Sequence, residues 1–169
     1  MNLIRTIALV AVGFTGIATP QKVVSQYDRE TDFSKFKTYK WIIIQGTTPN
    51  QITAQNIVGL VNTALGQRGL LQSEGNTDLL VGFQTSVDQQ RQINWFNNGG
   101  PRMGGMGQAT TSIIEVGTLV VDMHDPGQKQ LLWRSSATKT LNRGGNPAKN
   151  YERLQRGVDK LLKDFPPKK

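Results

Sequence analysis

Apolar and polar residues alternate along several short segments of this chain, which is the pattern of strands in a half-buried sheet. Five segments show this pattern: 23–27, 38–44, 79–87, 113–124 and 130–140. The last two are separated by Asp125-Pro126-Gly127, which suits a tight turn with proline in its second and glycine in its third position. The sequence therefore predicts five strands, and the last two form a hairpin.

Two other segments repeat their apolar residues every three or four positions, which predicts amphipathic helices. The first helix is expected over residues 49–68, with Thr48 as its cap, Pro49 in the first helical position and Gly69 at its end. The second begins at Asn146-Pro147 and ends at Pro166-Pro167. The two apolar stripes consist of Ile57, Val58, Val61, Ala64 and Leu65, and of Tyr151, Leu154, Val158, Leu161, Leu162 and Phe165.

These elements follow one another as β-β-α-β-β-β-α, and both helices need cover from the same sheet. We expect an α+β fold: a two-layer sandwich in which two helices pack on one face of a mainly antiparallel sheet of about five strands. A length of 169 residues is typical of one domain, which we place at residues 19–169. Residues 97–108 hold five glycines and one proline, and we expect them to form a loop.

The first 18 residues have the three-part layout of a secretory signal peptide. Arg5 precedes an apolar segment at 7–14, and Gly16 and Ala18 supply small residues before a cleavage site. The uncharged run is shorter than the roughly 20 residues that cross a hydrocarbon core. We expect an exported protein of the periplasm or outer envelope. The alternatives are a first buried element of the domain and a retained membrane anchor.

Twenty Lys and Arg against twelve Asp and Glu give a net charge of +8, and the chain has no cysteine. The lack of cysteine excludes disulfides, thiolate metal sites, cysteine nucleophiles and lipid attachment through cysteine. The basic residues are scattered and do not alternate with aromatic ones, so we expect no nucleic acid partner. The charge favours loose contact with anionic lipid or polysaccharide, and membrane association that is at most peripheral; solubility alone is the other interpretation.

Several short motifs occur in a fixed order between Val23 and Pro167. They are Tyr27-Asp28, Asp32-Phe33-Ser34-Lys35-Phe36-Lys37-Thr38-Tyr39-Lys40-Trp41, Asp78-Leu79-Leu80-Val81, Gly117-Thr118-Leu119-Val120-Val121-Asp122, Leu132-Trp133-Arg134 and Phe165-Pro166-Pro167. This ordered set resembles a bacterial family known as domain of unknown function 4136. The resemblance implies an envelope protein with an α+β domain and no established activity. Many members carry a lipidated cysteine, which this chain lacks.

The motif residues also have a structural interpretation. We expect Phe33, Phe36, Tyr39 and Trp41 to attach the connection between the first two strands to the core, and Asp32 to accept hydrogen bonds from the backbone amides that follow it. The remaining motif residues that we single out lie in the predicted hairpin: Gly117, Asp122 and Trp133.

The sequence offers few groups for catalysis, and we expect no cofactor and no metal. His124 is the only histidine, no Gly-x-Ser-x-Gly elbow accompanies it, and we expect it exposed beside a turn. Weaker interpretations are a copper site of His124, Met103 and Met106, and a hard-metal site at residues 28–32. The glycine-rich segment does not match a phosphate-binding loop.

We expect a non-enzymatic binding or interaction module whose partner is an envelope protein or an anionic envelope polymer. The residues proposed for the partner surface are Arg91, Trp95, Phe96 and Arg102, which flank or lie in the loop at 97–108. Anchoring of the two aromatic residues to the core is the alternative. Two other functions stay open: a hydrolase of envelope polymers that uses Asp78 and Asp122, and an electrostatic binder of anionic lipid or polysaccharide.

Overall fold

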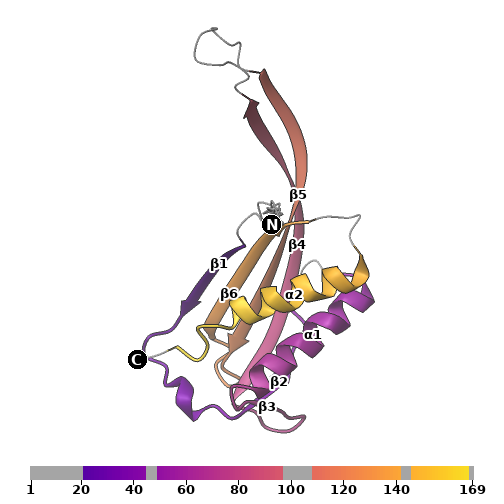
Figure 1. Ribbon diagram of the computed structural model, residues 1–169. Helices are drawn as coiled ribbons and strands as arrows, with labels where there is room; N and C mark the ends of the chain where they lie inside the picture. Colours follow the sequence, from indigo (N-terminus) through magenta and orange to yellow (C-terminus); the bar gives the residue numbers. More distant parts are fainter. Residues whose placement is uncertain (1–20, 45–48, 97–107, 142–145, 168–169) are drawn as a thin grey trace, which may run out of the picture.

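The computed structural model describes residues 21–44, 49–96, 108–141 and 146–167. Six strands form one sheet, and two helices pack against one of its faces, so the predicted α+β class is confirmed (Figure 1). The elements are β1 (Lys22–Tyr27), the 3-10 turn η1 (Phe33–Lys35), β2 (Thr38–Trp41), α1 (Gln51–Gly66), β3 (Leu71–Gln72), β4 (Leu79–Phe96), β5 (Gln108–His124), β6 (Leu131–Thr140) and α2 (Pro147–Leu161). The expected signal peptide lies outside the described residues.

The strand order across the sheet is β1-β6-β5-β4-β2-β3. β2 pairs in parallel with both β3 and β4, because α1 carries the chain back before it re-enters the sheet. All other described pairs are antiparallel. The sheet is therefore mainly antiparallel, as predicted, but it contains one strand more, since the two-residue β3 is too short to show a pattern.

α1 begins later than the sequence indicates. Its cap is Asn50, whose Oδ1 accepts a hydrogen bond from the Thr53 backbone N–H over 2.9 Å, so the expected cap at Thr48 is wrong. Pro49 consequently lies before the cap instead of in the first helical turn. The chain leaves the helix at Gly69, whose φ of +83° is a conformation that glycine adopts without strain, as predicted.

α2 begins where the sequence indicates, with Asn146 as the cap and Pro147 in the first turn. Leu154 is half-buried and Val158 and Leu161 are buried, which confirms the second apolar stripe. Tyr151, the fifth residue of the helix, is the exception: it is exposed at the amino-terminal end of the stripe.

The core lies between the sheet and the two helices. Trp133, Val121 and Val81 point to the helices from three neighbouring strands, and Ile57 and Val61 meet them from α1. All five side chains are fully buried. None of the described helices is long and apolar enough to cross a membrane.

The hairpin of β5 and β6 forms as predicted, but its turn differs. The Lys129 N–H donates to the Asp125 carbonyl and the Asp125 N–H donates to the Gln130 carbonyl, so the connection is longer than a tight turn. Lys129, with a φ of 56°, takes the left-handed conformation in this connection. A β-bulge between Met123 and His124 accompanies this turn.

Candidate functional site

Three of the four residues proposed for a partner surface lie in a strand. β4 continues to Phe96, nine residues beyond the predicted end at Val87. Arg91, Trp95 and Phe96 are therefore strand residues, with Arg91 exposed and paired opposite Ile113 of β5. The side chains of Trp95 and Phe96, together with Arg102 and the rest of the loop, lie outside the described residues.

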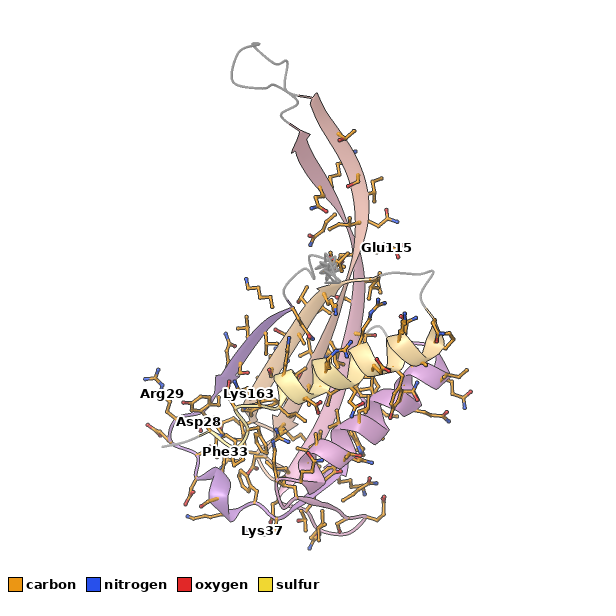
Figure 2. All side chains as sticks on the ribbon, in the orientation of Figure 1. Asp28, Arg29, Phe33, Lys37, Glu115 and Lys163 are labelled. Carbon is orange, nitrogen blue, oxygen red and sulfur yellow. The ribbon has the colours of Figure 1, made fainter. Side chains whose placement is uncertain are left out.

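The far part of the β4–β5 hairpin extends beyond the body of the molecule (Figure 1). We call residues 87–96 and 108–115 the distal hairpin; Figure 2 shows Glu115 near the point where it leaves the body. β6 ends its pairing with β5 at Val116, and β2 pairs with β4 only as far as Val81. Within the described part of the chain, β4 and β5 are the only strands that pair along the distal hairpin, and at its base the Leu141 N–H donates to the Glu115 carbonyl over 2.7 Å.

One face of the distal hairpin carries exposed apolar side chains. Val87, Ile93 and Ile113 are 56%, 57% and 67% exposed. Val87 and Ile93 lie on the same face because they are an even number of residues apart in β4, and Arg91 between them lies on that face too. Ile113 of β5 pairs opposite Arg91, so it also lies on this face. The sequence did not predict this surface, because polar residues between the three apolar ones hide the alternation that marks a strand.

The aromatic motif residues are structural, as the sequence predicts. Phe33 is buried, and its ring makes edge-to-face contacts with the rings of Tyr27, Phe36 and Phe165 at centroid distances of 6.3, 5.8 and 5.9 Å. Asp32 caps η1, since its Oδ1 accepts from the Ser34 N–H over 3.3 Å. These contacts fasten the segment between β1 and β2 to the residues that follow α2.

Tyr39 and Trp41 share one hydrogen-bond acceptor on α1. The Tyr39 hydroxyl and the Trp41 indole N–H both donate to Oδ1 of Asn62, over 2.7 and 2.8 Å. The Asn62 amide donates in turn to Gln72 of β3 over 3.1 Å. Burial raises the pKa of the Tyr39 hydroxyl, so the group stays protonated and acts as a donor. This network fixes α1 on the edge of the sheet and contains no candidate nucleophile.

Two glycines lie beneath large side chains. Gly117 faces Leu141, whose nearest side-chain atom would lie 2.8 Å from a Cβ at that position. A side chain on Gly82 would occupy the place of Ile44, which bends over the face opposite the helices. Because glycine has no side chain, Leu141 after β6 and Ile44 after β2 can cross closely over the sheet at these two positions.

Asp122 lies on the face opposite the helices and forms a bidentate ion pair. Its two carboxylate oxygens accept from Nε and Nη2 of Arg134 over 2.6 and 2.7 Å. Gly82 and Arg134 are its cross-strand neighbours, and Ile44 occupies the space above Gly82. The hydrogen bonds that Arg134 donates to Asp122 raise the pKa of its guanidinium. A carboxylate held in this way is a structural group.

Asp78 ties the start of β4 to the start of β2. Its Oδ2 accepts from the Lys37 and Thr38 backbone N–H groups over 2.8 and 2.9 Å and from the Thr38 hydroxyl over 2.9 Å. These bonds lower the pKa of Asp78 below its ordinary value of 3.8, the backbone bond from Lys37 having the largest effect. The carboxylate is thus engaged in hydrogen bonds at the strand end.

The Asp78 network predicts a pH-dependent stability. Because its folded pKa is lowered, the carboxylate stabilises the native state above the unfolded pKa and loses this effect as the pH falls through the folded pKa. At neutral pH, Asp78→Asn should have a lower free energy of unfolding than the unmodified chain. The difference should shrink as the pH falls from about 5 to about 3, measured by urea unfolding. Asp88→Asn in the exposed part of β4 is the control, and a difference that stays constant with pH would contradict the prediction.

The two carboxylates do not converge on one site. Asp122 pairs opposite Gly82, which places it four residues along β4 from Asp78, roughly 13 Å at strand spacing. Glycoside hydrolysis needs two carboxyl groups within about 5 to 10 Å. Each carboxylate also has its own hydrogen-bond partners. The geometry gives no support to the hydrolase hypothesis built on this pair.

His124 is half-buried before the β5–β6 turn rather than exposed, and it lies between Leu80 of β4 and Leu131 of β6 in the sheet. Among the described residues, no three His, Asp or Glu side chains lie close enough to hold a metal ion. Asp28 accepts hydrogen bonds from Thr31 and from the Glu30 N–H, which lower its pKa. Met103 and Met106 lie outside the described residues.

A shallow depression of about 550 Å³ lies between η1 and the segment after α2. The residues that line it are Tyr27, Arg29, Thr31, Asp32, Phe33, Ser34, Pro166 and Pro167. Figure 2 shows Arg29 at its outer side, pointing away from the body. Its one carboxylate, on Asp32, is engaged with Ser34 and Lys35, so the depression holds no pair of groups suited to acid–base catalysis.

The model of a family described as a domain of unknown function, DUF4136, matches residues 23–167. No curated protein matches the sequence significantly. Two solved structures share the fold. One is a PDZ domain protein from Parabacteroides distasonis, with 14% identity and a TM-score of 0.55 over 90% of this chain and 38% of that chain. The other is a PelC dodecamer from Paraburkholderia phytofirmans, with 10% identity and a TM-score of 0.55 over 89% of this chain and 100% of that chain.

Proposed function

We propose that this chain, which belongs to the family of domain of unknown function 4136, is a non-catalytic interaction module whose contact surface is the distal hairpin. The observation that carries the proposal is that Val87, Ile93 and Ile113 are exposed on one face of a two-stranded ribbon, which they share with the exposed Arg91. An isolated two-stranded ribbon is only marginally stable in water. A partner that covers this face would stabilise it.

The partner that we propose is a second copy of this chain. Two distal hairpins that meet by their apolar faces would bury Ile93 and Ile113 from each copy. Fully burying an isoleucine contributes about 1.5–3 kcal/mol, so the sum is comparable with the cost of association. Assembly should therefore depend on concentration. PelC, which shares the fold, is described as a dodecamer, and this supports testing self-association first.

The proposal includes export to the cell envelope. It rests on the charged start, apolar segment and small residues within positions 1–18. This part of the proposal is tested by fractionating cells and measuring the mass of the amino terminus of the protein from each fraction. A protein that begins after Ala18 in the envelope fraction supports export, and a full-length protein in the cytosol contradicts it.

Ile93→Asp combined with Ile113→Asp should strongly weaken self-association. Charged side chains on the apolar face oppose its burial, and we expect the concentration at half-assembly to rise at least tenfold, which is about 1.4 kcal/mol. Light scattering coupled to size-exclusion chromatography over a range of concentrations measures the mass. The matched control is Val24→Asp, which changes an exposed apolar residue on the edge strand β1.

The control should assemble like the unmodified chain. A chain that is monomeric at every concentration, or an assembly that both variants weaken equally, would overturn the proposal. Far-ultraviolet circular dichroism checks that each variant keeps its fold; because Ile93 and Ile113 contact no core residue of the body, it should remain unchanged.

A further inference from the structure

Four basic residues of α2 lie on one side of the helix. They are Lys149, Arg153, Arg156 and Lys160, at spacings of four, three and four residues. At 100° per residue they fall within an arc of about 60°, and at 1.5 Å per residue they extend over about 16 Å. We call this set the cationic row. Arg153 is half-buried and the other three are exposed, so the row faces solvent beside the sheet.

Lys139 of β6 adds a fifth positive charge next to the row. Its position shares the helix-covered face of the sheet with Ala137. Burial lowers the pKa of its ammonium group, and repulsion by Arg153, Arg156 and Lys160 lowers it further. α2 packs against β6, so the charges of the two elements lie near one another on the surface. Concentrated like charge destabilises the fold slightly, unless an anion neutralises it.

The acidic residues of α2 lie on a different side. Glu152 and Asp159 are seven residues apart and form a second row about 80° away from the cationic row. Gly157 lies on the other flank, in close approach to the Gln21 side chain. Glu152 nevertheless reaches the row, since its carboxylate lies 3.9 Å from Nη1 of Arg156 in an exposed ion pair. A narrow anion that follows the cationic row competes with this one carboxylate for Arg156, whereas a flat anionic membrane would meet both rows.

We propose that the cationic row and Lys139 form a binding surface for a linear, carboxylate-bearing polysaccharide. Guanidinium groups bind carboxylates through two parallel hydrogen bonds, and two arginines in the row supply this geometry. Peptides dock through apolar anchors, and the only exposed large apolar side chain on α2 is Tyr151, outside the row. Single-stranded nucleic acid stacks on aromatic side chains, and none lies among these cations.

The test measures binding of the full chain to polygalacturonate by titration calorimetry at low salt. Arg153→Gln, Arg156→Gln and Lys160→Gln combined should weaken binding at least tenfold and make its salt dependence shallower. The charge-matched control combines Lys22→Gln, Arg29→Gln and Lys35→Gln, which lie on β1 and the segment after it. This control should weaken binding less than threefold.

A gain of affinity gives a second readout that misfolding cannot imitate. Glu152→Gln with Asp159→Asn removes the acidic row and should strengthen binding to polygalacturonate. Equal losses in the α2 variant and the charge-matched control would overturn the proposal, as would tighter binding to anionic vesicles, polyglutamate or single-stranded DNA than to polygalacturonate. Binding by the Ile93→Asp, Ile113→Asp variant should be unchanged, which separates this site from the distal hairpin.

Discussion

Trp133→Ala should lower the free energy of unfolding by about 3–5 kcal/mol, the range for removing a buried aromatic side chain from a core. Trp133 is fully buried in β6, opposite Met123 of β5 and Tyr27 of β1. Its ring also contacts that of Phe165 at a centroid distance of 5.3 Å. The alanine variant would leave a cavity where β6 meets the segment after α2. Urea unfolding monitored by circular dichroism measures the loss.

Trp133→Phe is the matched control for this prediction. The indole Nε1 is buried and has no hydrogen-bond partner among the described residues, so phenylalanine removes an unsatisfied donor while it keeps most of the ring. Loss of volume costs about 1 kcal/mol, and removal of the unpaired donor offsets part of it. We expect the phenylalanine variant within about 1 kcal/mol of the unmodified chain. A loss equal to that of alanine would show that the indole nitrogen, not the packing, is essential.

The sequence predicted the helices well because burial is one-sided there. Ile57 and Val61 repeat at helical spacing, and the sheet covers the side on which they lie. The end of β4 could not be predicted in the same way. Residues 88–92 are polar on both faces, since no other element covers them, and their strand conformation comes from pairing with β5. Alternation of apolar and polar residues marks a strand with one buried face, so it is absent where both faces of a strand are exposed.

The polar contacts were harder to predict than the core. Asn62 joins Tyr39 and Trp41, which lie more than twenty residues earlier in the chain, and its position beside Val61 carries no local signal of this role. The pairing of Asp122 with Arg134 depends on the register of β5 and β6. A tight turn at Asp125-Pro126-Gly127 predicts a different register from the longer, bulged connection that forms. The register of two strands decides which side chains meet across them, and the local sequence specifies this register only weakly.

Arg134→Met should lower the free energy of unfolding by about 3 kcal/mol or more, and it should do more damage than Asp122→Asn. The Asp122 side chain is 1% exposed, whereas that of Arg134 is 44% exposed. Without Arg134, a carboxylate stays buried beside Ile44 with no charged partner, and breaking such a pair costs about 3–5 kcal/mol. Without the Asp122 charge, the guanidinium can turn to water, so we expect a cost of about 1–2 kcal/mol.

The asymmetry distinguishes a structural pair from one that is kept for binding or catalysis. Replacing both residues with apolar ones, Asp122→Leu with Arg134→Met, removes the buried charge as well as its partner and should recover most of the stability lost in Arg134→Met. Urea unfolding of the unmodified chain, Asp122→Leu, Arg134→Met and the double variant completes the cycle. If the double variant is as unstable as Arg134→Met, the loss comes from packing of the arginine stem rather than from the orphaned carboxylate. The ion pair would then stabilise the outer face of the sheet only through its apolar atoms.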